Sequence, residues 1–157
     1  MAKTVIIYYS FTKNTKRIAE KIQLAKGYEA IRIDTVTPYT GDYNDIVNQG
    51  QDEVESRFKP EITPAKIDLS QYDTIILGTP VWWYTVAPAV LTFLTSHVFN
   101  GKTIIPFATN GGLLGHTMKD IQKICEGAKV ENTMNIQFSE DKLNIPESDL
   151  KNWIESL

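Results

Sequence analysis

Residues 3–15 read KTVIIYYSFTKNT, and this stretch decides the fold. Its first part, residues 3–10, is rich in β-branched and aromatic residues without polar alternation, which is typical of a strand buried on both faces. Short hydroxyl and amide side chains follow, and from Asn14 to Ala25 apolar residues recur with a helical period. We interpret Asn14 as the N-cap of this helix and Gly27 as its stop. The stretch therefore predicts a buried strand, a polar loop and a helix in succession.

The same alternation continues along most of the chain. Four further buried strands are predicted at residues 28–34, 74–79, 102–109 and 130–138. Apolar residues at helical spacing lie between or after them, at residues 86–94, 114–125 and 150–157. Strands that alternate with helices indicate parallel βαβ units with right-handed crossovers. We therefore predict one α/β domain spanning residues 1–157, a doubly wound five-stranded parallel sheet with helices on both faces.

Residues 35–72 carry the weakest pattern. Pro38 and Gly41 interrupt the chain, and Asp42 is a candidate cap for a helix that ends before Pro60 and Pro64. We expect a surface helix within a long crossover.

Composition excludes several classes of protein. The 157 residues are 42% apolar and 22% charged, which is ordinary for a globular chain. One cysteine, Cys125, and two histidines are too few for a Cys/His zinc site, so we expect no metal. A net charge of −3 offers no basic surface for nucleic acid or anionic lipid. The apolar run Val5–Tyr9 is far shorter than the roughly 20 residues of a membrane span. We expect a soluble, cytoplasmic protein without a membrane segment.

Three loops are predicted to meet at one edge, because ligands of such sheets bind beyond the carboxyl ends of the strands. The first loop, residues 10–15, has hydroxyl and amide side chains and leads into the start of a helix, where unpaired N–H groups and the helix dipole favour an anion such as phosphate. The alternative is a turn in which Asn14 only caps the helix.

The second loop, residues 79–84, has two adjacent tryptophans that can stack on a flat ring. The third loop, residues 109–115, is rich in glycine, which lets a backbone approach a ligand closely. The predicted binding residues are Ser10, Thr12, Lys13, Asn14, Thr15, Thr79, Pro80, Val81, Trp82, Trp83, Tyr84, Thr109, Asn110, Gly111, Gly112 and Gly115.

These loops resemble those of the flavodoxin-like family of FMN-binding proteins. The stretch SFTKNT at residues 10–15 is similar to the family's phosphate loop, T/S-x-T-G-N-T, and GTPVWW at residues 78–83 is similar to its first flavin loop. The resemblance spans nearly the whole chain and is closest to the short members. It implies the strand order 2-1-3-4-5, FMN as a non-covalent cofactor, its phosphate in the first loop and its ring between the second and third. Lys13 departs from the pattern, which has glycine there. A negative φ at Lys13 would allow its ammonium to strengthen phosphate binding.

The resemblance leaves several functions open. One is an electron carrier between partner proteins, and another is a reductase that passes hydride from NAD(P)H to a quinone-like acceptor. A flavin-fold interaction protein that has lost its ligand is the third. No side chain is predicted as catalytic, although His116 could donate a proton to an acceptor or be an exposed residue of a first helical turn. Cys125 is interpreted as a buried core residue. Carriers of this kind are commonly monomers and the related reductases oligomers, so we expect a monomer or a small homo-oligomer.

Overall fold

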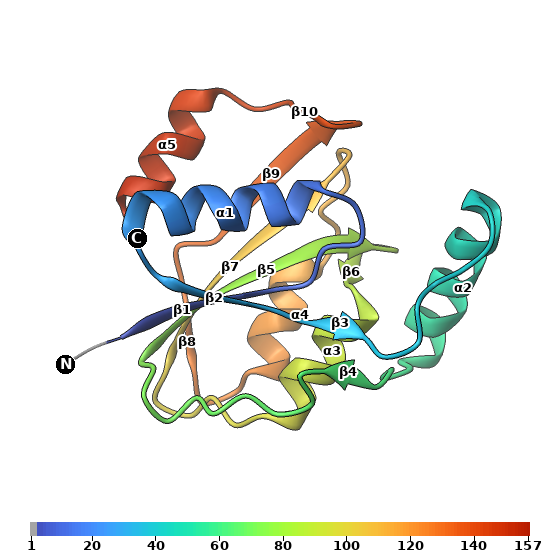
Figure 1. Cartoon of the computed structure of the whole chain (residues 1–157), viewed down its shortest axis with the longest axis horizontal. Helices are drawn as coiled ribbons and strands as arrows, with labels where there is room; N and C mark the ends of the chain where they lie inside the picture. Colours follow the sequence, from blue (N-terminus) through green and yellow to red (C-terminus); the bar gives the residue numbers. More distant parts are fainter. Residues whose placement is uncertain (1–2) are drawn as a thin grey trace.

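A computed structural model describes residues 3–157, and a twisted sheet runs through its centre (Figure 1). Five parallel strands stand in the order β2-β1-β5-β7-β9, which confirms the predicted order 2-1-3-4-5. Their bounds are β1 Thr4–Tyr8, β2 Glu29–Arg32, β5 Thr74–Trp82, β7 Thr103–Asn110 and β9 Met134–Ser139. Strand β10 (Lys142–Leu143) adds an antiparallel edge to β9.

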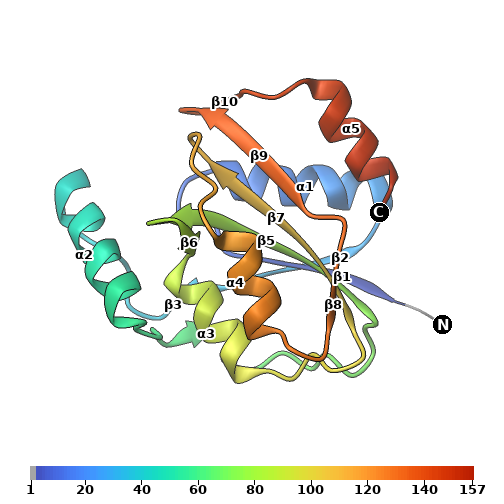
Figure 2. The ribbon, with the colours of Figure 1, turned by 180° about the vertical axis from the view of Figure 1, so that it is seen from behind.

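The residues of β1 show how the sheet is buried on both faces. Ile6 and Tyr8 pack with the helices α1 and α5, whereas Val5 and Ile7 pack with α3 and α4. Adjacent residues of a strand point to opposite faces, so a strand covered on both sides must be apolar throughout. Figures 1 and 2 show the two helix pairs on opposite faces of the sheet. The bounds of the helices are α1 Asn14–Lys26, α3 Pro88–Ser96, α4 Thr117–Ile124 and α5 Glu147–Glu155.

Helix α2 (Tyr43–Ser56) confirms the predicted surface helix and stands apart from both layers (Figures 1 and 2). Asp42 accepts a hydrogen bond from the N–H of Asp45, whose side chain accepts one from the N–H of Asp42. This reciprocal capping box satisfies two donors that a helix start otherwise leaves unpaired. The helix approaches the sheet at Gly50, where an added Cβ would lie 3.2 Å from Cε3 of Trp82. A bare backbone at Gly50 therefore allows α2 to dock on the end of β5.

Three predicted strands were wrong in extent. The strand predicted at residues 28–34 is divided at Ile33 into β2 and β3 (Asp34–Thr35), and β3 belongs to a separate small sheet. The strand predicted at residues 74–79 continues to Trp82 and turns back into β6 (Thr85–Val86), so Thr79–Trp82 are strand rather than loop. The strand predicted at residues 130–138 is divided into β8 (Lys129–Val130) and β9. Asn132 lies between them with φ 52°, a left-handed conformation that interrupts an extended strand.

Several boundaries also differ from the prediction. Lys13, not Asn14, is the N-cap of α1, and it caps through no side-chain hydrogen bond. Gly27 closes α1 in the left-handed conformation, as predicted. Helix α4 begins at Thr117 and ends at Ile124, with Cys125 as its C-cap residue, so it is shorter than the helical pattern predicted at residues 114–125. The sequence also did not indicate the two-stranded antiparallel sheet of β3 (Asp34–Thr35) and β4 (Ile62–Thr63). Among residues 3–157, no helix has both the length and the hydropathy of a membrane span.

Candidate functional site

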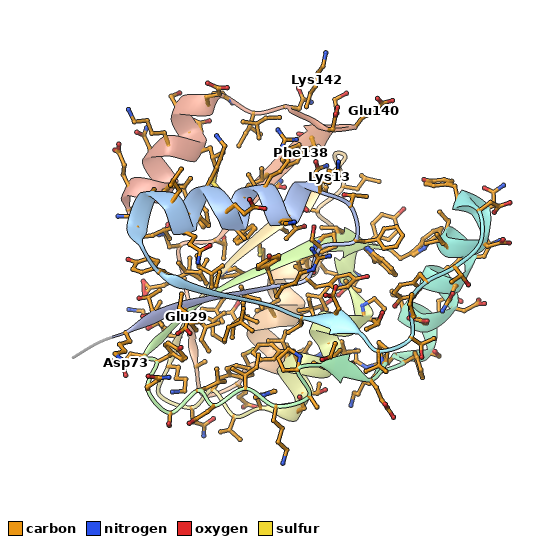
Figure 3. All side chains as sticks on the ribbon, viewed as in Figure 1. Lys13, Glu29, Asp73, Phe138, Glu140 and Lys142 are labelled. Atoms are coloured by element: carbon orange, nitrogen blue, oxygen red, sulfur yellow. The ribbon has the colours of Figure 1, made fainter. Side chains whose placement is uncertain are left out.

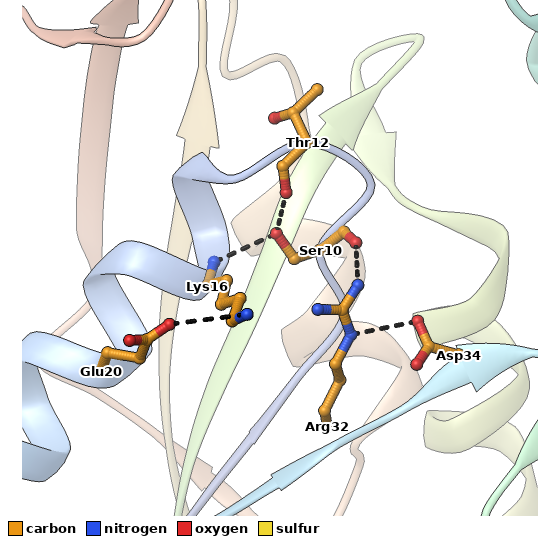
Figure 4. A network of polar contacts seen from close by, with 6 residues as sticks. All are labelled: Ser10, Thr12, Lys16, Glu20, Arg32 and Asp34. Atoms are coloured by element: carbon orange, nitrogen blue, oxygen red, sulfur yellow. Dashed lines mark hydrogen bonds and ion pairs between the residues drawn. The ribbon is translucent and has the colours of Figure 1, made fainter.

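The first loop is held in shape by Ser10 (Figure 4). Its hydroxyl donates to the carbonyl of Thr12 and accepts from the backbone N–H of Lys16 at 3.1 Å. Its own carbonyl accepts from Arg32 Nη2 at 2.9 Å, and Arg32 is oriented by an ion pair with Asp34 at 3.1 Å. Ser10 is 2% exposed, so its hydroxyl shapes the loop from inside.

This shape leaves several backbone donors open at the start of α1. The N–H of Lys16 is used by Ser10, and that of Arg17 donates to the carbonyl of Lys13 at 2.9 Å. Within residues 3–157, no protein acceptor is found for the N–H groups of residues 12–15. Four such donors lie at the positive end of a helix of 13 residues, an arrangement typical of an anion-binding nest. The donor set fits a phosphate.

Lys13 sits on this nest in an ordinary backbone conformation. Its φ of −85° and ψ of −11° are right-handed, so lysine is unstrained where the family pattern has glycine. Figure 3 shows Lys13 at the start of α1, on the edge of the sheet that also has Glu140. Asn14 Nδ2 donates to the carbonyl of Glu140 at 2.9 Å. Asn14 therefore ties the loop to the turn between β9 and β10, and the side chain of Lys13 is exposed.

A buried hydroxyl pair joins the first loop to the third. Thr15 Oγ1 and Thr109 Oγ1 lie 2.7 Å apart, and the two residues are 2% and 5% exposed. The start of α1 and the end of β7 are thereby fixed relative to one another.

The second loop is a tight hairpin with unusual residues at its tip. Trp83 and Tyr84 have φ values of 48° and 71°, and both are partly exposed. A hairpin turn with two left-handed residues ordinarily uses Asn-Gly, because a Cβ in this region costs about 1–2 kcal/mol per residue. Two aromatic residues in such positions indicate a role in binding rather than in stability.

The two adjacent tryptophans have different surroundings. Trp82 packs edge to face with Phe11 at 5.6 Å and with Tyr39 at 5.0 Å between ring centroids. It also joins the core below α3. Trp83 instead lies against α2, where its Nε1 donates to the carbonyl of Val47 at 3.2 Å.

The third loop presents its backbone to the same edge. Asn110 donates through Nδ2 to Asn135 Oδ1 at 2.6 Å and accepts through Oδ1 from the N–H of Gly112 at 2.9 Å. A Cβ added to Gly111 would meet no atom within 4 Å. At Gly115, with φ 61°, an added Cβ would lie 2.4 Å from the carbonyl oxygen of Tyr84. Glycine is therefore required at 115 for packing, whereas at 111 it leaves open space.

Two open clefts result at this edge. The glycine-loop cleft has a volume of about 390 Å³ and is lined by Val81, Trp83, Tyr84, Asn110, Gly111 and Leu113. The α2 cleft has a volume of about 430 Å³ and is lined by Phe11, Tyr43, Ile46, Val47, Gly50, Val81, Trp82 and Trp83. Val81 and Trp83 belong to both walls. Each volume is in the range of small-molecule sites, about 300–1,000 Å³.

The predicted binding residues divide into two groups in the structure. Those with open donors or a place in a cleft wall are Thr12, Lys13, Asn14, Thr15, Val81, Trp82, Trp83, Tyr84, Asn110 and Gly111. The others shape the walls from behind. Thr79 is fully buried and its hydroxyl accepts from the N–H of Ala87 at 3.2 Å, while Ser10, Thr109 and Gly115 have the internal roles described above. Pro80 and Gly112 lie next to cleft residues and line neither cleft.

The sequence analysis missed the wall that α2 contributes. Tyr43, Ile46, Val47 and Gly50 line the α2 cleft, together with Phe11 from the first loop. Only Phe11 carried a signal, because it is a large apolar residue inside a polar loop that a phosphate site does not need.

Two residues outside the clefts bear on the predicted chemistry. His116 is the N-cap residue of α4, with its side chain 58% exposed and Nδ1 paired with the carboxylate of Asp120. Thr85 donates to the same carboxylate. His116 lines neither cleft, which favours the exposed first-turn interpretation. Cys125 is 2% exposed, and burial raises the pKa of its thiol to about 11, so the core interpretation is confirmed.

With this geometry established, the relatives of the chain can be placed. A sequence profile of the family named Flavodoxin matches residues 3–157. The chain belongs to the flavodoxin family. The comparison with curated protein sequences gave no match.

Solved structures of the family share the whole fold. A candidate flavoprotein from Bacteroides uniformis is 28% identical, with 98% of each chain covered and a TM-score of 0.83. A second one, from Bacteroides eggerthii, is 27% identical, covers 99% of this chain and 98% of its own, and has a TM-score of 0.80. A flavoprotein from Lactobacillus acidophilus, solved in complex with FMN, is 24% identical with a TM-score of 0.75 and covers 98% of this chain and 99% of its own.

Proposed function

We propose that this flavodoxin binds FMN non-covalently and transfers electrons through it. The observation that carries the proposal is the nest of open N–H donors at residues 12–15, which lies on the same edge as the glycine-loop cleft. Phosphate needs such donors, and a flat ring with a polar edge needs an apolar cleft with backbone groups at its rim. FMN, when bound, supplies the redox chemistry, and the chain supplies orientation and electrostatics. The FMN complex of the Lactobacillus relative supports the same cofactor.

The proposed roles follow from the position of each group. The N–H groups of residues 12–15 would hold the phosphate, with the ammonium of Lys13 beside it. Val81, Trp83 and Tyr84 would bound the ring on one side, and the backbone at Asn110 and Gly111 would meet its polar edge.

Substitution of Gly111 by valine tests the proposal. Gly111 has no positive φ and has open space around its Cβ direction, so Gly111→Val is expected to fold normally. Because Gly111 lines the glycine-loop cleft, we expect a valine there to obstruct the ring, so that the Kd for FMN, measured by quenching of flavin fluorescence, rises at least about 10-fold.

Ala65→Val is the matched control, because Ala65 is exposed and lies in the segment before β5, away from the carboxyl edge. It should leave the Kd unchanged. Failure of the wild-type protein to bind FMN would contradict the cofactor and would favour an interaction protein without ligand. Unchanged binding by Gly111→Val would contradict the placement of the ring.

A reductase is the second candidate, and one observation favours it over a carrier between proteins. None of the residues that line the two clefts is charged, whereas small electron carriers often dock through an acidic surface. The balanced reaction is NAD(P)H + H⁺ + quinone → NAD(P)⁺ + hydroquinone. A reductase would consume nicotinamide only when both FMN and a quinone are present. A carrier would leave the nicotinamide unoxidised and, after chemical reduction, would reduce a basic partner protein.

A further inference from the structure

The α2 cleft is a second recess beside the site proposed for the flavin ring. Its walls include Val81 and Trp83, which also bound the glycine-loop cleft. A molecule in the α2 cleft is therefore separated from the proposed ring position by the thickness of one shared wall. The proposed FMN site does not need the second recess, because the open donors and the glycine loop already serve phosphate and ring.

The side chains that line the α2 cleft indicate what kind of ligand it binds. Four of the eight lining residues are aromatic (Phe11, Tyr43, Trp82 and Trp83), and the rest are aliphatic or glycine. Aromatic side chains favour flat rings through stacked and edge-to-face contacts. The lining residues carry no charge, so they offer nothing to the phosphates of a nicotinamide dinucleotide. The capping acids Asp42 and Asp45 at the start of α2 make an anionic occupant still less favourable.

The recess is also preorganised. Trp82 is fixed by edge contacts with Phe11 and Tyr39 and by the close approach of Gly50. Trp83 is fixed by its hydrogen bond to the carbonyl of Val47. Ordering these side chains therefore costs little when a ligand binds, which raises affinity for a ring of matching shape.

We propose that the α2 cleft binds the electron acceptor, a flat and uncharged quinone of one or two fused rings. The inference rests on the proposed FMN function, in its reductase form, and adds the place at which the quinone binds. The quinone takes up two electrons and two protons and leaves as the hydroquinone. The electrons and one proton come from NAD(P)H as hydride, and the second proton comes from water. The acceptor and the nicotinamide then have different binding surfaces on the chain.

Filling the cleft tests this proposal. Ile46 lines it from α2 and is half-buried, so Ile46→Trp would occupy its volume. Asn48→Trp is the matched control, because Asn48 is an exposed residue of the same helix and lines neither cleft. Val47→Phe is a second filling variant, and thermal melts of all variants establish that they fold.

The first readout uses FMN-free protein and 2,3-dimethyl-1,4-naphthoquinone, whose substituted ring does not add to thiols. We expect saturable quenching of tryptophan fluorescence in the wild type and in Asn48→Trp, with at least about 10-fold weaker binding in the two filling variants. The second readout is the KM for the same quinone in the FMN-loaded protein. It should rise by a similar factor in the filling variants, with the Kd for FMN changed less than about twofold.

The outcomes separate the two proposals. If the filling variants match Asn48→Trp in both readouts, the acceptor site lies elsewhere and the inference is wrong. If they weaken FMN binding as much as quinone binding, the α2 cleft is the flavin site and the inference is also wrong. If the wild type binds no FMN but binds quinone in a way that the filling variants abolish, the proposed function fails and the quinone site stands.

Discussion

Lys13 illustrates how one residue can depart from a family pattern without strain. Its backbone is right-handed at φ −85°, so glycine is not required there, and the exchange adds an exposed cation to the residue that starts the helix. The benefit of such a surface charge depends on salt, because exposed pairs are screened.

We predict that Lys13→Met weakens FMN binding about 2- to 5-fold at low ionic strength and that the difference disappears near 0.5 M salt. The measurement is the Kd for FMN over a salt series. Lys66→Met is the control, since Lys66 is exposed and lies in the segment before β5. Equal effects of the two substitutions, or an effect of Lys13→Met that salt does not change, would show that the ammonium does not act on the phosphate.

Single residues also show where prediction from sequence stops. The hydroxyl and amide types in residues 10–15 predicted an anion site, and the geometry of the backbone fits one. The sequence did not separate Ser10, which uses its hydroxyl inside the loop, from Thr12, which is exposed. That division depends on Arg32, a residue of another strand that holds the carbonyl of Ser10.

Among the elements, the hairpin from β5 to β6 carries the clearest sign of a binding role. Trp83 and Tyr84 occupy left-handed positions that favour glycine or asparagine. These positions lower stability, and that loss is offset only if the two rings contribute to binding.

We predict that Tyr84→Gly leaves the free energy of unfolding unchanged or raises it by up to about 1 kcal/mol, because glycine adopts φ 71° without strain. FMN binding should weaken about 3- to 10-fold through the lost ring contact. Urea unfolding and flavin titration measure the two effects. Tyr84→Ala removes the same ring but keeps a Cβ, so it should be less stable than Tyr84→Gly by about 1 kcal/mol. A reversed order of stability would contradict the strain argument.

The sequence predicted helices and strands well where apolar residues follow a regular pattern and poorly where they do not. The apolar run of β1 and the helical spacing of α1 predicted these two elements correctly. Pro80 and the aromatic residues after it do not alternate with polar residues and so predict a loop, yet pairing with β6 extends the strand to Trp82. Helix α2 was predicted from its cap at Asp42, its apolar residues and the prolines that follow it. Its contribution to the site depends on the approach of Gly50 to Trp82, a contact between distant segments that periodicity does not encode.

For the whole molecule, buried ionisable groups predict a loss of stability in alkali. Burial raises the pKa of the Cys125 thiol from its ordinary value near 9 to about 11, and it raises the pKa values of Tyr9 and Tyr39 above 10. The hydroxyl of Tyr39 also donates a hydrogen bond to the Glu53 carboxylate, which raises the pKa of Tyr39 further. Each group stays protonated in the folded chain at a pH where it ionises in the unfolded chain.

The unfolded state therefore binds fewer protons above pH 9, and the free energy of unfolding falls as pH rises. We predict a level stability from pH 7 to about 8.5 and a decline between about 9 and 11. Urea midpoints over this range measure it. Cys125→Ala should be less stable at neutral pH but decline less steeply. A stability that stays constant or rises up to pH 10.5 would contradict the prediction.

The overall fold could be predicted from the sequence, because alternating strands and helices in a chain of this length allow few topologies. The order β2-β1-β5-β7-β9 follows the prediction. The position of α2 relative to the sheet could not be predicted from the sequence. A long crossover has no fixed path, and only its contacts determine where its helix lies.

The hydroxyl pair between Thr15 and Thr109 has a consequence for how a two-part ligand is held. It joins the loop at residues 10–15, proposed to hold a phosphate, to the strand that leads into the glycine loop. Once one part of such a ligand is bound, the surface that binds the other part is already correctly placed, and the second contact forms at high effective concentration. The affinity for the complete ligand then exceeds the affinities of its separate parts. The hydroxyl pair contributes to this affinity although it contacts neither part of the ligand.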